Sequence, residues 1–173
     1  MKKALIVMAL LVTLAMTIPL ALADPAHCKV TGGGWIIPEG EEDKGTFGFV
    51  AMRYTPDQTP FPDPPLKGEL EYVDHNTGMN VHGEVNIFLY ITPDPYLPNQ
   101  EAVFAGTCKV NGEDGFTFWC DVFDNGEPGK DVDLFHIQVF TLGGSMIYDS
   151  GLQILGGGNI QTHPLPPPMN PEV

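Results

Sequence analysis

The chain has 173 residues, of which 22 are acidic and 8 are basic, so its formal net charge at pH 7 is −14. Less a leader segment, this length corresponds to one ordinary domain with a hydrophobic core of its own. The negative charge argues against nucleic acids and anionic membranes as partners, because their phosphate groups would be repelled.

The chain opens with the pattern of a secretory signal peptide. Two lysines precede a long apolar run that ends in the small-residue pattern Ala-Leu-Ala, and we expect cleavage before Asp24. A membrane anchor is the alternative, but Pro19 breaks the end of the apolar run. The sequence therefore predicts a secreted, extracellular protein, with no membrane association once the leader is removed. The expected divisions are a signal peptide at 1–23, a single β-domain at 24–163 and a proline-rich tail at 164–173.

Short runs of alternating apolar and polar residues, separated by glycine and proline, predict strands and no sturdy helix. The expected strands lie near residues 29–37, 46–54, 68–73, 80–92, 102–110, 116–123, 133–141, 145–149 and 159–162. About nine short strands indicate an all-β fold, an antiparallel β-sandwich, with a closed β-barrel as the alternative.

Two details of this pattern can be checked against a structure. In the strand at 80–92 the odd positions are expected to face the core, namely Val81, Val85, Ile87, Leu89 and Ile91. The glycine runs 32–34 and 156–158 enter the first and last strands, and we expect these strands to lie side by side. The segment 55–66 contains five prolines and is expected to form a stiff surface connection or an edge.

Three cysteines leave one unpaired after a single bridge. With a turn through residues 111–115, Cys108 and Cys120 fall nearly opposite each other with both sulfur atoms in the core. We expect them to form a disulfide, which agrees with an oxidising compartment. Pairing of Cys28 with either of them is the alternative; otherwise Cys28 is a free thiol or an intermolecular partner.

The mature chain also resembles a known family. Its segments GGGWI, FGFVA, GELEYVDH, MNVHGEV, FAGTCKVNGEDGFTF, DNGEPGKDVDLFHIQ and LGGGNIQTH follow the order found in post-COAP domains, small secreted prokaryotic domains often found beside choice-of-anchor modules. The resemblance runs from Gly32 to His163 and implies an extracellular β-domain without an established activity. It supplies no catalytic residues.

One acidic, glycine-containing stretch is a candidate calcium site, because calcium takes six to eight oxygen ligands. A tight turn at Asp124-Asn125-Gly126, with side chains bonded to their own backbone, explains the same residues. The candidate ligands are Asp121, Asp124, Asn125, Glu127, Asp131 and Asp133.

Other candidate groups are more scattered. Glu69 and Glu71 project from one face of a strand, as a glycosidase pair might, although alternation alone explains them. The histidines at 75, 82, 136 and 163 show no spacing of a transition-metal site. Trp119, Phe123 and Tyr90 lie on the outward phase of their strands and form a candidate ligand face.

We therefore expect a non-enzymatic extracellular binding or structural module, with calcium as the one candidate cofactor. The alternatives are a carbohydrate-active or other hydrolytic enzyme that uses acidic residues, and a subunit of an extracellular assembly that self-associates. The expected partner is an extracellular or cell-surface molecule.

Overall fold

The structure, a computed structural model, describes residues 27–54, 66–91 and 100–163. The predicted signal peptide, nearly all of the proline-rich connection at 55–66 and the tail lie outside these residues. Within the described ranges, no helix is long and apolar enough to cross a bilayer. The strands are His27–Ile36 (β1), Gly45–Tyr54 (β2), Leu66–Asp74 (β3), Asn80–Ile91 (β4), Gln100–Val110 (β5), Glu113–Asp124 (β6), Leu134–Thr141 (β7), Met146–Asp149 (β8), Gln153–Ile154 (β9) and Gly157–His163 (β10).

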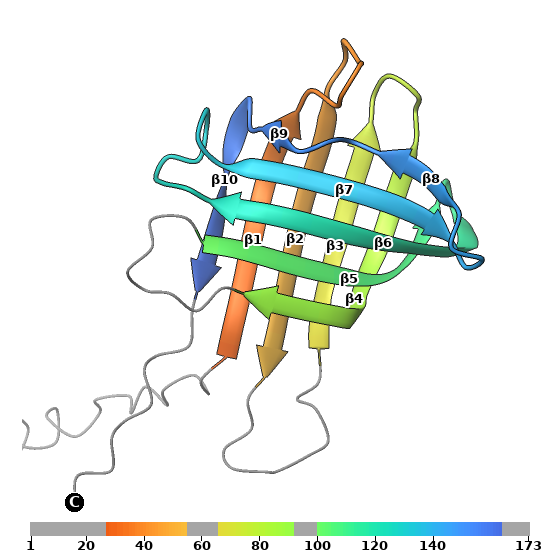
Figure 1. Cartoon of the computed structure of the whole chain (residues 1–173), viewed down its shortest axis with the longest axis horizontal. Coiled ribbons are helices and arrows are strands. Elements are labelled where there is room, and N and C mark those ends of the chain that lie inside the picture. The colour runs from red at the N-terminus through yellow and green to blue at the C-terminus, as the bar shows by residue number, and fades with distance from the viewer. Residues whose placement is uncertain (1–26, 55–65, 92–99, 164–173) are drawn as a thin grey trace, which may run out of the picture.

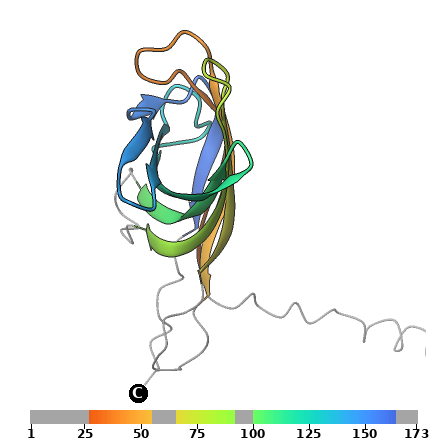
Figure 2. The same cartoon turned by 90° about the vertical axis from the view of Figure 1, so that its right-hand side faces the viewer.

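These strands form one antiparallel sheet, which confirms the prediction of an all-β antiparallel fold. The strand order is β10-β1-β2-β3-β4-β5-β6-β7-β8, and β9 also pairs with β7. The sheet curls into a half-barrel, so that β10, β1, β2 and β3 form one layer and β5, β6 and β7 cross it as a second layer (Figures 1 and 2). The two layers expected of a sandwich are therefore two parts of one continuous sheet.

The strand β4 makes the bend between the layers. Its pairing with β5 shifts register between Glu84 and Phe88, which is the mark of a bulge. Asn86 lies in this bulge and stabilises it, because its amide donates to Thr107 Oγ1 (2.9 Å) and accepts from Thr107 N (3.1 Å). The prediction that Ile87 faces the core is wrong: the bulge interrupts the alternation, and Ile87 is 55% exposed. The other four positions predicted to face the core in this strand are buried.

The core lies between the two layers and is rich in aromatic rings. Phe47 of β2 stacks on Phe135 of β7, with ring centroids 3.9 Å apart and an interplanar angle of 5°. Phe49 of the same strand contacts Phe104 of β5 at 4.9 Å. Fully burying one such side chain contributes about 1.5–3 kcal/mol. These rings therefore hold the layers together.

The first and last strands lie side by side, as the paired glycine runs predict. In the pairing of β1 with β10, Gly34 lies opposite Gly158 and Trp35 lies opposite Gly157. A Cβ atom at Gly158, where φ is +110°, would come within 2.1 Å of the Gly33 carbonyl oxygen. Only glycine tolerates both this conformation and this approach.

Candidate functional site

Two carboxylates of the predicted calcium loop bind the outer edge of β10. Asp124 accepts hydrogen bonds from Thr162 N (2.8 Å) and Thr162 Oγ1 (3.0 Å). Asp133 accepts hydrogen bonds from Ile160 N (2.8 Å) and Asn125 N (2.9 Å). Because β10 ends the sheet, the outward amides of β10 have no neighbouring strand to bind. The two side chains supply acceptors in place of that strand.

Asp133 is fully buried in this arrangement. Burial raises the pKa of its carboxyl group, and the nearby charge of Asp124 raises it further. Hydrogen bonds from the backbone amides of Asn125 and Ile160 oppose this rise. Asp133 therefore has the environment of a structural acceptor with little access to solvent.

The remaining predicted calcium ligands face different partners. Glu127 accepts hydrogen bonds from two side-chain amides of β10 (3.0 and 2.8 Å), and these bonds lower its pKa. Asp131 lies beside Lys130 (3.7 Å), and Asp121 faces His136 (3.0 Å). Across the described residues, no three carboxylate, imidazole or thiol groups come together in a way that could hold a metal ion. This geometry gives the calcium prediction no support.

The predicted disulfide is not formed in the structure. Cys108 and Cys120 are both buried, as predicted, but both are free thiols. Cys108 lies opposite Phe116, whereas Cys120 lies opposite Phe104. The two cysteines are therefore four residues out of register, about 13 Å along the strands, and a disulfide needs Cα atoms within about 7 Å.

The error in register comes from the hairpin turn. We expected a loop over 111–115, but β5 ends at Val110 and β6 begins at Glu113, so only Asn111 and Gly112 form the turn. Asn111 (φ +52°) and Gly112 (φ +85°) have the left-handed conformations of a tight hairpin turn. With the shorter turn, the residue opposite Cys108 is Phe116, which lies nearer to the turn than Cys120 does. The side chain of Cys28 lies outside the described residues.

The described histidines contact different partners. The described contacts are His75 Nε2 with Thr46 Oγ1 (3.0 Å), His82 Nδ1 with Glu71, and His136 Nδ1 and Nε2 with Asp121 (3.0 Å) and Asp149 (2.8 Å). His136 makes two of these contacts and thereby forms a cluster with Asp121 and Asp149. Sequence reasoning missed this cluster, because residues on different strands meet only when the register is known.

The structure places the three predicted ligand-face aromatics on the outer face of the second layer. Trp119 and Tyr90 are exposed by 39% and 49%, and Phe123 is half-buried. Tyr90 pairs with Val103 and Val103 pairs with Asp121, so Tyr90 and Asp121 lie in one row across the strands. Asp121 stands between Trp119 and Phe123 along β6. Trp119 and Phe123 therefore flank Asp121 along β6, and Tyr90 lies in the same row two strands away.

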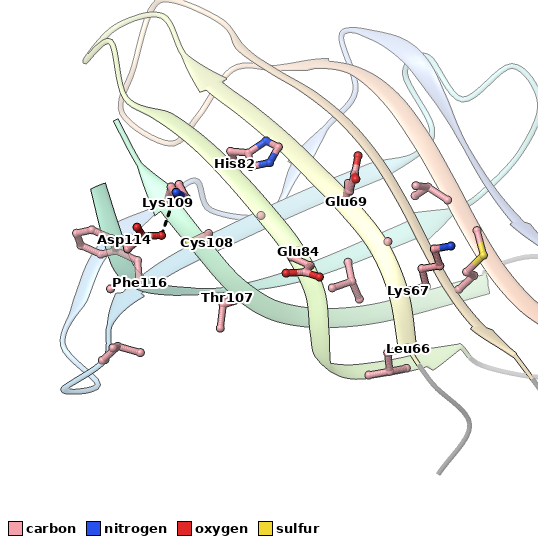
Figure 3. A pocket seen from close by; sticks show the side chains of 17 residues that line it. Leu66, Lys67, Glu69, His82, Glu84, Thr107, Cys108, Lys109, Asp114 and Phe116 are labelled. Carbon is pink, nitrogen blue, oxygen red and sulfur yellow. Dashed lines mark ion pairs between the residues drawn. The ribbon is translucent and has the colours of Figure 1, made fainter. Parts of the chain in front are cut away.

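A groove of about 760 Å³ lies over β3, β4 and β5 (Figure 3). Polar and charged side chains of these strands line it, with Lys109 and Asp114 paired at one end (3.3 Å) and Lys67 toward the other. Its apolar lining includes Leu66 and Phe116. Gly68 and Gly83 add no side chains to this lining, which leaves space between the charged residues.

Two glutamates of neighbouring strands line the middle of this groove. Glu69 of β3 lies directly opposite Glu84 of β4 in the strand register, and both are exposed. Like charges at directly opposite positions destabilise a sheet. The sequence pointed to Glu69 with Glu71 instead, but Glu71 contacts His82, and the partner of Glu69 is Glu84.

Comparisons with known protein families, with curated proteins and with solved structures found no match to this chain.

Proposed function

We propose that the protein is a secreted, non-enzymatic binding module of the post-COAP type, whose groove over β3–β5 accepts an extracellular partner with a cationic group. The signal-peptide pattern supports the extracellular location, and the order of the sequence segments supports the family. The opposed carboxylates of Glu69 and Glu84 carry the proposal for the ligand.

The physical reason is electrostatic. Two exposed carboxylates held opposite each other repel, and a ligand ammonium or guanidinium group between them would replace repulsion with two attractive contacts. Lys109 also lies in the groove, but it is already paired with Asp114 and so does not neutralise the two glutamates. A cationic side chain of a partner protein, or a polyamine, fits this requirement.

The alternative is a hydrolase that uses the same acidic residues. General acid catalysis needs a carboxylic acid that its surroundings keep protonated near neutral pH. Both Glu69 and Glu84 are exposed to solvent on an open groove, whereas such an acid needs a site that excludes water. Recognition of a cation therefore accounts for these residues better than catalysis.

The test is titration of the mature protein with spermine and with a tetralysine peptide, followed by isothermal calorimetry. We expect the double variant Glu69→Gln/Glu84→Gln to weaken binding at least about tenfold, since hydrogen bonds to charged groups contribute about 1.5–3 kcal/mol. The control, Glu42→Gln/Asp43→Asn, removes the same charge from an exposed loop outside the groove.

Equal weakening in both double variants would mean that the ligands sense only the net charge, and would contradict the proposal. So would the absence of binding by the unaltered protein to either ligand.

A further inference from the structure

A continuous series of hydrogen bonds fixes Trp119 on the outer face of the second layer. Trp119 Nε1 donates to Asp121 Oδ1 (3.0 Å), and the other oxygen of Asp121 contacts His136 Nδ1 (3.0 Å). His136 Nε2 contacts Asp149 Oδ1 (2.8 Å), and Gln138 Nε2 donates to Asp149 Oδ2 (2.7 Å). His136 therefore joins the two carboxylates, one at each ring nitrogen.

A backbone amide also donates a hydrogen bond to this series. Asp149 Oδ1 also accepts a hydrogen bond from Gly151 N (2.8 Å). Burial alone would raise the pKa of Asp149, but its hydrogen bonds from Gln138, Gly151 and His136 outweigh that effect and lower it. The carboxylate at the base of the series therefore stays ionised.

An indole ring fixed in this way is prepared for binding. Holding a side chain in one orientation before a ligand arrives lowers the entropy lost on binding. Trp119 is 39% exposed, and Tyr90, with 49% of its surface exposed, lies on the same face. A large aromatic surface left in contact with water and held rigid by four polar side chains is not explained by packing of the core.

We propose that this face, defined by Trp119, Tyr90 and Asp121, binds a neutral polysaccharide. A pyranose ring presents C–H groups with partial positive charge, which stack on the negative face of an aromatic ring, and hydroxyl groups at its edge. Asp121 stands among the aromatic residues and, as a carboxylate with two acceptor oxygens, can accept from such hydroxyls. The aromatic faces and the acceptor thus match the two kinds of surface of a sugar.

The charge of the face and of the chain selects among polysaccharides. Asp121 and Asp149 place two carboxylates on this face, and the whole chain has a formal net charge of −14 at pH 7. Anionic polysaccharides would be repelled, so we expect neutral chains to bind. This site shares none of its residues with the groove over β3–β5, and its failure would leave the groove proposal standing.

The test is affinity electrophoresis of the mature protein in native gels that contain hydroxyethylcellulose, laminarin, xylan or galactomannan, with polygalacturonate and chitosan as charged comparisons. We expect retardation by at least one neutral polysaccharide and a loss of about tenfold or more in affinity for Trp119→Ala. Ile37→Ala removes a side chain of nearly equal exposure, 37%, from the other layer and should leave migration unchanged.

A second measurement does not depend on Trp119→Ala folding. Tyr90→Ala should weaken retardation by the same polysaccharide, because it removes the second ring of the face. His136→Gln should weaken it as well, as His136 is a positioning residue that acts through Asp121 on Trp119. In a double-mutant cycle, His136→Gln should then add no further loss to Trp119→Ala.

Three results would overturn the proposal. One is the absence of retardation by all four neutral polysaccharides, and another is retardation only by a charged one. The third is unchanged affinity in both Trp119→Ala and Tyr90→Ala, with folding confirmed by thermal melting.

Discussion

Two neighbouring carboxyl groups, Asp74 and Glu41, have opposite pKa shifts, because hydrogen bonds outweigh burial at Asp74, whereas burial and the neighbouring Asp74 both raise the pKa of Glu41. Asp74 is buried, but Asn76 N (2.8 Å), Thr77 N (3.1 Å) and Thr77 Oγ1 (2.7 Å) donate to it. Burial would raise its pKa, and these bonds outweigh burial and lower it. Burial raises the pKa of Glu41, and Asp74 raises it further. Among the described residues, Glu41 Oε2 is buried without a hydrogen-bond partner.

We predict that Glu41→Gln stabilises the protein at neutral pH. The pKa of Glu41 in the folded state lies above its ordinary value of 4.5, so ionising Glu41 costs folding free energy at neutral pH and costs none below 4.5. The expected gain is below about 1 kcal/mol, because Glu41 is partly exposed to solvent. Urea denaturation at neutral pH and below pH 4.5 checks this: the gain should vanish in acid. A variant that is less stable at neutral pH would contradict the reasoning.

At the scale of the element, the bend in β4 depends on the absence of a side chain at Gly106 of β5. This glycine lies opposite the bulge, where a Cβ atom would come within 1.8 Å of the Glu84 carbonyl oxygen. The clash is with backbone, which cannot rotate away. The close approach of β4 and β5 therefore requires glycine at this position.

We predict that Gly106→Ala lowers the free energy of unfolding by about 1–3 kcal/mol, the usual range for overpacking. Gly48→Ala in β2 is the matched control, because nothing lies within 4 Å of the added Cβ and the residue is also in a strand. Guanidinium denaturation of both variants measures the difference. If the two substitutions have the same effect, the bend does not depend on close backbone contact.

Strands with regular alternation could be predicted from the sequence, and irregular ones could not. In β6 the buried residues Phe118, Cys120 and Val122 alternate with outward ones, as expected. In β4 a bulge interrupts the alternation of buried and exposed residues at Ile87, and no local sequence pattern indicates this bulge. The short strand β9 was missed because two residues pair with β7 only after the chain has folded back.

In the candidate sites, too, features set by the local sequence could be predicted, and features set by the pairing of strands could not. The outward phase of Trp119 and Tyr90 is a local property, so these residues could be predicted as a ligand face. The opposition of Glu69 and Glu84 depends on the register between two strands, which the turn fixes. The acidic loop was identified as rich in oxygen ligands, but its role at the outer edge of β10 depends on which strand ends the sheet.

At the scale of the whole molecule, the acidic loop and the layers combine to protect one end of the sheet. Asp124 and Asp133 bind amides of β10, and Gly129 N donates to Asn159 of β10 (2.6 Å). Edge amides left free would be available for pairing with another chain. The loop after β6 therefore links the second layer to the first across the open side of the half-barrel.

The two buried thiols provide a measure of opening of the whole fold. Cys108 and Cys120 lie in the core between the layers, and burial raises the pKa of Cys108 to about 11 and that of Cys120 well above its ordinary value. We predict that the mature Cys28→Ser variant shows no reactive thiol when native and both thiols in denaturant. Its melting temperature should not change with a reducing agent, because the structure contains no bridge between these cysteines. A thiol-specific colorimetric reagent and thermal melting provide the two measurements. Absence of free thiols in the unfolded variant, or a lower melting temperature after reduction, would show that the strands β5 and β6 pair in a different register.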